Sequence, residues 1–193
     1  MNSENWLYII ISLVVFNYIF STVLNFINNK YWKDEIPPIM QDYYKKDNYI
    51  KAKKYAKEKG QINFISSTLS TLITLLFLTL KGYGYLNLLI SNYYEIPFLQ
   101  SSMFFLSLFV LSDLISIPFS CYNTFVIEEK YGFNKMTVKT FIFDKIKSYL
   151  LTIILGGALL YGALLLVNIL ENGFWLSLWL SLIHISEPTR RIT

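Results

Sequence analysis

The sequence has one cysteine, few charged residues and no arginine before position 190. Cys121 alone cannot form an internal disulfide or supply the thiolates of a structural zinc site, which excludes a disulfide scaffold and a zinc finger. Only 16% of the 193 residues are charged, whereas soluble domains carry about 25%. This composition argues against a water-soluble globular domain and indicates a membrane protein.

Apolar residues make up 54% of the chain and occur in long runs without charge. A helix needs about 20 such residues to cross the hydrocarbon core of a bilayer. Four runs reach this length and predict membrane spans at about 6–27, 62–80, 98–119 and 149–170, and a fifth span starts at 173. The predicted fold is all-α: a polytopic α-helical membrane protein with four complete transmembrane helices plus the start of a fifth.

The lysines are unevenly distributed between the loops, with nine at positions 30–59, five at 130–147 and one, Lys81, between the second and third spans. Because basic loops stay in the cytoplasm, this distribution places the N-terminus outside and the two basic loops inside. Within the first basic loop, residues 49–59 have the spacing of a helix with a lysine-rich face. That face contacts anionic headgroups or a partner domain, or is simply solvated.

The last residues differ in composition from the rest of the chain. His184, Arg190 and Arg191 are the only histidine and arginines, and the string LSLIHISEPTR contains them except for the final arginine. The string resembles translated sequencing adapter, so residues 180–193 are interpreted as a non-native, adapter-derived tail in which His184 has no function. The alternative is a short natural polar terminus.

Asp113 lies in the middle of the third predicted span and Pro118 follows five residues later. A carboxylate at membrane depth usually faces the protein interior or a water-filled cavity, and proline ends or kinks a helix. Both are therefore candidate cavity-lining residues, and Asp113 is a candidate proton relay. The alternative is a protonated or hydrogen-bonded side chain that only packs spans together.

The fourth span contains small residues that allow helix backbones to approach closely, namely Gly156, Gly157, Ala158 and Gly162. These are interpreted as helix-packing positions, since none of them can act as an acid, base or nucleophile.

The segment before that span, residues 128–147, is too polar for lipid and too aromatic for a free linker. We expect it to dock on another domain, with Gly132 and Asn134 allowing a turn between two short helices. An amphipathic segment lying on the bilayer is the alternative.

One string, YNTFVIEEKYGFNKMTVKTFIFDKIKS from residue 122, is similar to the loop after the third span of CAAX prenyl proteases, which are integral-membrane zinc metalloendopeptidases. YWKDEIPP, AKKYAKEKGQINFISST, LSDLISIPFS and LLTIILGGALL add to the similarity, which covers about residues 6–179 and resembles bacterial members. The resemblance implies that residues 1–179 form an N-terminal membrane domain whose helices wall a large chamber. It also implies a docking loop for the catalytic domain at Glu128, Glu129, Lys130, Tyr131, Gly132, Phe133 and Asn134.

The resemblance does not bring a catalytic site with it. The family binds zinc through an H-E-x-x-H helix and a distal glutamate, and this sequence has no such motif. Glu128 and Glu129 point about 100° apart on a helix and cannot be carried over as ligands or base. No catalytic or metal residue and no cofactor is predicted here, and the fragment is expected to be inactive, although the full-length parent would bind zinc.

The predicted partners are the lipid bilayer, the chain's own missing C-terminal metallopeptidase domain and, in the parent, a peptide or prenylated-protein substrate. No nucleic-acid partner is indicated. The expected location is a bacterial inner membrane. A transporter or channel that uses Asp113 in its pathway is the alternative from another functional class.

Overall fold

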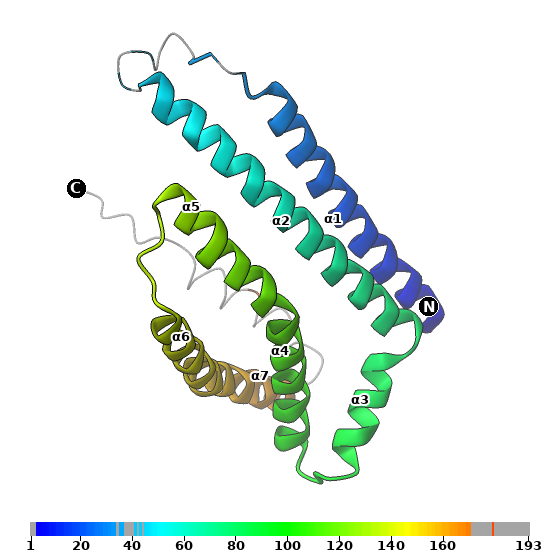
Figure 1. Cartoon of the computed structure of the whole chain (residues 1–193). Helices are drawn as coiled ribbons and strands as arrows, with labels where there is room; N and C mark the ends of the chain where they lie inside the picture. The colour runs from blue at the N-terminus through cyan, green and yellow to red at the C-terminus, as the bar shows by residue number, and fades with distance from the viewer. Residues whose placement is uncertain are drawn as a thin grey trace, which may run out of the picture. The chain divides into compact units, whose positions relative to one another are not determined.

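The computed structural model describes residues 3–33, 35–36, 41, 43, 45–170 and 179. Every regular element in these residues is helical, which confirms the predicted all-α fold (Figure 1). Within the described residues, four helical stretches are long and apolar enough to cross a membrane: Glu4–Tyr31, Lys46–Thr79, Pro97–Tyr131 and Val138–Val167. Each of them covers all or nearly all of one of the four predicted spans. The predicted start of a fifth span at 173 and the predicted tail at 180–193 lie outside the described residues.

The chain divides into two compact units. The first comprises residues 1–89 with 107–136, and the second comprises residues 90–106 with 137–193. Helix α4 (Pro97–Tyr122) begins in the second unit and continues in the first.

Helices α1 (Ser3–Tyr31) and α2 (Lys46–Thr79) form an antiparallel hairpin in the first unit (Figure 1). The hydroxyl groups of Tyr18 and Thr68 are 2.8 Å apart and join the two helices within their apolar stretches. Near the loop, the Trp32 indole N–H donates to the Tyr49 hydroxyl at 2.9 Å. The hairpin is thus joined by polar contacts both at mid-length and at one end.

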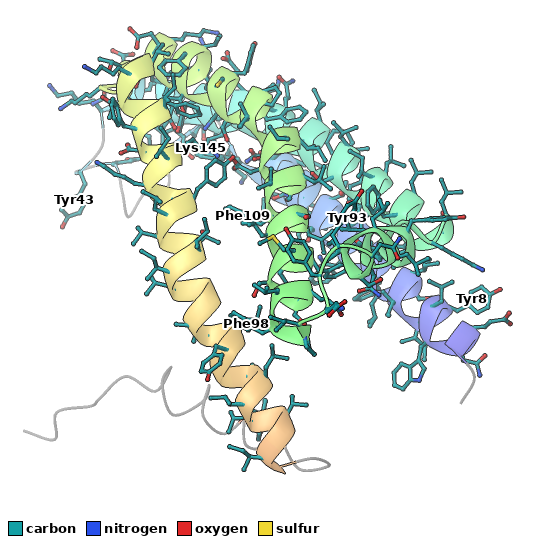
Figure 2. All side chains as sticks on the ribbon, turned by 90° about the horizontal axis from the view of Figure 1, so that it is seen from below. Tyr8, Tyr43, Tyr93, Phe98, Phe109 and Lys145 are labelled. Atoms are coloured by element: carbon teal, nitrogen blue, oxygen red, sulfur yellow. The ribbon has the colours of Figure 1, made fainter. Side chains whose placement is uncertain are left out.

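Few side chains are buried within the protein. Among the described residues, only Ile90, Ile127 and Tyr131 are buried, whereas large apolar side chains such as Leu13 and Tyr8 are exposed. Figure 2 shows Tyr8 projecting away from α1. An apolar surface of this extent would be unstable in water, and it is the surface that a bilayer solvates.

Two short turns of π-helix interrupt the long helices. Helix α4 continues past Pro118 through η2 (Asn123–Glu128) into α5 (Glu129–Tyr131). The helix therefore does not end at the proline and continues beyond residue 119, where the third span was predicted to end. Helix α6 (Val138–Leu151) continues through η3 (Thr152–Gly156) into α7 (Gly157–Leu170), so the fourth helix begins 11 residues before the predicted start of its span at 149.

A short helix, α3 (Gly82–Ser91), follows α2 and was not predicted. The chain turns at Lys81, which has a φ of 57°. A Cβ atom at Gly82 would lie 2.8 Å from the Phe77 ring, so only glycine fits directly after this turn.

Candidate functional site

The predicted docking loop lies against α2 through two ion pairs. The Lys130 ammonium nitrogen is 2.6 Å from Oε1 of Glu58, and the Lys59 ammonium nitrogen is 3.3 Å from Oε1 of Glu128. Each side of the contact contributes one acid and one base, so the charges compensate each other. We call this group of four charged residues, together with Tyr55, Tyr131 and Phe133, the α2–α5 cluster.

Aromatic side chains pack beside these ion pairs. The Tyr131 hydroxyl donates to Oε1 of Glu58 at 3.0 Å, and the Tyr131 ring is buried. Tyr55 of α2 meets Tyr131 and Phe133 edge to face, with ring centroids 5.4 and 5.0 Å apart. Lys51 lies 5.9 Å above the Phe133 ring. The cluster therefore combines ion pairs, hydrogen bonds and aromatic contacts across two helices.

The pKa shifts within the cluster favour the charged forms of Glu58, Lys59 and Lys130. The cluster lies at the polar end of α2, before the uncharged run that begins at Gly60. The hydrogen bond from Lys130 lowers the pKa of Glu58, and the same bond raises the pKa of Lys130. The Tyr55 hydroxyl and then Glu128 raise the pKa of Lys59.

The pKa of Tyr131 is also shifted away from neutral pH. Desolvation is the main cause that raises the pKa of its phenol, and the hydrogen bond to Glu58 adds to the effect. None of these groups is shifted toward neutral pH, so the arrangement suits attachment of one helix to another better than proton transfer.

The remaining residues of the predicted loop form the turn after α5. Gly132 has a φ of 75°, in the left-handed region that glycine adopts without strain. The Asn134 side chain donates to Glu129 at 3.0 Å and accepts from the Met136 backbone N–H at 2.7 Å. Thr137 then caps α6 by accepting from the Thr140 backbone N–H. A turn at these positions was predicted, and it joins the end of one long helix to the start of the next.

Asp113 and Pro118 do not form a site together in the described structure. Asp113 is half-buried, and the Ser116 hydroxyl lies 2.9 Å from its backbone oxygen and 3.4 Å from its carboxylate. Pro118 is exposed. A role for either residue in lining a cavity stays a prediction.

A large groove lies in the first unit along α1 and α2, and Tyr122, Ile127 and Lys130 also line it. Its volume is about 1680 Å³, and neither Asp113 nor Pro118 lines it. One wall carries amides and a hydroxyl from α1, four residues apart: Asn17, Ser21, Asn25 and Asn29. The other wall carries hydroxyl groups of α2 from Ser67, Ser70, Thr71 and Thr74. Sequence analysis missed this stripe, although its four-residue spacing places it on one helix face.

The small residues of the fourth helix have no close neighbours in the described structure. A Cβ atom would meet nothing within 4 Å at Gly157 or Gly162, and at Gly156 it would meet only the nearby Thr152 side chain. Ala158 is exposed. Helix packing through these positions stays a prediction. The helix does contact the start of α4, because the rings of Phe98 and Tyr161 lie edge to face at 5.6 Å.

Within the described part of the chain, no group of three histidine, cysteine, aspartate or glutamate residues could hold a metal ion. His184 lies outside that part.

Comparison with known proteins identifies the family. Residues 26–186 match the family described as the CAAX prenyl protease N-terminal part with five membrane helices. The chain belongs to this family. The CAAX prenyl protease 1 homolog of Dictyostelium discoideum is 33% identical over 189 residues, covering 94% of this chain and 44% of that protein. The human CAAX prenyl protease 1 homolog is 32% identical, covering 78% of this chain and 33% of that protein.

The crystal structure of Ste24p from S. mikatae has the same fold. It superposes with a TM-score of 0.78 at 28% identity, covering 93% of this chain and 44% of that one. The chain thus corresponds to the N-terminal membrane part of the family and spans less than half the length of these relatives. The resemblance predicted from residues 122–148 is confirmed.

Proposed function

We propose that this chain is the membrane part of a zinc metalloendopeptidase that cleaves CAAX-type or other membrane-associated proteins. The family match over residues 26–186 carries the proposal. The zinc ligands and the catalytic glutamate would come from the portion of the relatives that this chain does not span. In this proposal the chain itself supplies a chamber wall, membrane anchorage and a docking surface.

The chamber wall is assigned to the groove along α1 and α2, and within it to the polar stripe of α1. An amide in hydrocarbon without a partner costs several kcal/mol, so four amide and hydroxyl side chains on one face of α1 favour a hydrated interior over lipid. Away from the groove, α1 carries exposed apolar residues such as Phe20, which does not line it. A polypeptide substrate could lie along such a wall, because amides and hydroxyls both donate to and accept from a peptide backbone.

The docking surface is assigned to the outer side of the α2–α5 cluster. Glu58 and Lys59 attach the loop to α2, which leaves the Phe133 ring 55% exposed and Glu129 exposed on the same turn. An exposed aromatic ring bordered by charges is a typical protein contact surface. We assign the missing metallopeptidase domain as its partner.

The location follows from the same proposal. The chain is an integral membrane protein, and the lysine distribution favours a cytoplasmic position for the ends of α2 and α5 that carry the cluster. The relatives described above are from eukaryotes, so they give no support to the expected bacterial inner membrane.

A chimaera tests the proposal. Residues 1–179 would replace the matching segment of the Dictyostelium relative, and cleavage of a prenylated CAAX peptide would be measured after reconstitution. We expect cleavage that depends on zinc and on the H-E-x-x-H motif of the relative. A chimaera that enters the membrane and binds zinc but cleaves nothing would contradict the proposal.

Thiol labelling tests the chamber wall separately. In a Cys121→Ser background, a membrane-impermeant thiol reagent should label Ser21→Cys, which lines the groove. The control is Phe20→Cys, whose native side chain is 53% exposed and does not line the groove. Equal labelling of the two variants would refute the hydrated groove.

A further inference from the structure

The groove along α1 and α2 is lined by side-chain amides that form no hydrogen bond within the described part of the chain. They belong to Asn17, Asn25 and Asn29 of α1 and to Asn63 of α2, and all four residues are exposed. A side-chain amide has two donor hydrogens and an acceptor oxygen. The groove therefore offers a set of unused donors and acceptors to a ligand.

This set extends into the membrane-spanning part of α1. Asn17 lies at the centre of the uncharged run between Glu4 and Lys30, 13 positions from each. At 1.5 Å per residue, it is about 20 Å from either charge, near the middle of a hydrocarbon core of about 30 Å. An amide at that depth is costly unless water or a ligand satisfies it. The position of Asn17 thus favours a groove that is hydrated or occupied.

The wall formed by α2 is rich in acceptors. Asn63, Ser67, Ser70 and Thr74 follow the spacing i, i+4, i+7 and i+11, which places them on one face of the helix. The Ser67 hydroxyl donates to the Phe64 carbonyl at 3.0 Å, and the Thr74 hydroxyl donates to the Ser70 carbonyl at 2.9 Å. Because their protons are used in this way, both hydroxyl oxygens can only accept from a ligand. A ligand between the walls therefore needs donors for these oxygens and acceptors for the amide N–H groups.

The spacing of the α1 wall matches that of an extended polypeptide. Its polar residues Asn17, Ser21, Asn25 and Asn29, here called the α1 polar row, repeat at about 6 Å along the helix axis. On one edge of an extended chain, the N–H and C=O groups of every second residue repeat at about 6.6–6.8 Å. Over the row, which is about 18 Å long, the mismatch reaches only about 2 Å. Rotation of the side chains can compensate for it.

We propose that the α1 polar row holds the substrate as an extended chain, through hydrogen bonds to its backbone. The proposal rests on the protease function proposed above and adds how the substrate is bound. Every second substrate residue faces the row, whose asparagines accept from its N–H groups and donate to its C=O groups, as the edge of a β-strand would. Ser67 and Thr74 accept from N–H groups on the other edge. Binding of this kind selects an extended conformation and not a particular sequence.

Protection of a thiol in the groove tests the proposal on the 193-residue chain in lipid nanodiscs. In the Cys121→Ser background, a peptide that binds along the row should slow labelling of Ser21→Cys by the impermeant reagent. Two blocked, uncharged peptides of about six residues, the length of the row, carry the same side chains and the same number of backbone N-methyl groups. One is methylated at every second residue and keeps one edge free. The other is methylated at consecutive central residues, which interrupts both edges.

The peptide with one free edge should protect the thiol better. We expect it to halve the labelling rate at a concentration at least about fivefold lower, the effect of one backbone hydrogen bond. Both peptides have the same composition, so unspecific apolar binding would not separate them.

A matched pair of variants assigns the effect to the row. Asn25→Leu removes one amide but keeps a side chain of similar shape, and it should raise the half-protective concentration of the first peptide about fivefold. Asn28→Leu makes the same exchange on α1 outside the groove and should leave that concentration unchanged. The comparison of the two peptides does not depend on Asn25→Leu, so it remains decisive even if this variant alters the hairpin.

Equal protection by the two peptides, or protection by neither, overturns the proposal. Equal effects of Asn25→Leu and Asn28→Leu overturn it as well. Failure of the protease function gives a different result: edge-dependent protection together with a chimaera that cleaves nothing contradicts the protease but not the row. Cleavage by the chimaera together with equal protection by both peptides contradicts the row alone.

Discussion

Truncation of Ile127 should separate the docking loop from α2. Ile127 is 2% exposed, which makes it the most buried side chain among the described residues, and it lies in η2 where that turn contacts α2. Ile127→Ala removes three carbon atoms, a transfer loss of about 2.4 kcal/mol at about 0.8 kcal/mol per group. The cavity left behind raises the total to about 3 kcal/mol.

The single cysteine provides the assay. Cys121 is half-buried near the end of α4, so a thiol-reactive fluorophore reports unfolding in detergent without an introduced label. For a chain of this size, a loss of about 3 kcal/mol lowers the Tm by roughly 6–12 °C. Ile65→Ala is the matched control, because Ile65 is 53% exposed on α2 and its truncation should shift the Tm by less than about 3 °C.

The comparison between the two isoleucines decides the outcome. Equal Tm shifts would show that η2 does not pack on α2 as described. An unchanged Tm in Ile127→Ala would have the same meaning.

Two further changes test the loop. Because the hydrogen bond from Lys130 lowers the pKa of Glu58, the contact stabilises the fold above the ordinary pKa of a glutamate and loses this effect as the pH falls through the lowered value. Glu58→Gln should therefore reduce the Tm at pH 7, and its difference from the unmodified chain should shrink in acid; a constant difference would refute the ion pair. Gly132→Ala should cost about 1–2 kcal/mol through its left-handed backbone alone, since its Cβ would meet nothing within 4 Å. Asn at the same position, which tolerates this conformation better, should recover part of the loss in the same thiol assay.

The membrane spans could be predicted because each depends on local composition. An uncharged run of about 20 residues needs no knowledge of its neighbours to be assigned to hydrocarbon. The turn at Gly132 and Asn134 could be predicted for the same reason, since both residue types favour turns wherever they occur. The limits of the helices could not be predicted from the uncharged runs, because helices continue through polar sequence such as residues 138–148.

The α2–α5 cluster could not be predicted in this way. Lys59 and Glu128 are 69 residues apart, and no periodicity in the sequence relates them. The docking loop was predicted, yet its attachment to Glu58 and Lys59 depends on how α2 and η2 meet. The polar face of α1 could have been predicted, because the four-residue spacing from Asn17 to Asn29 places these side chains on one side of the helix. It was missed because the run as a whole is apolar.

The π-helical turn at 123–128 has a consequence for how this part of the chain can vary. Such a turn holds one residue more than an α-helical turn, so it rotates everything after it by about 100°. The direction in which the Lys130 and Tyr131 side chains face therefore depends on the number of residues in this turn, and not only on which residues they are. A substitution within the turn does not change this rotation. Deletion or insertion of one residue would turn both side chains away from α2, toward the bilayer or toward water.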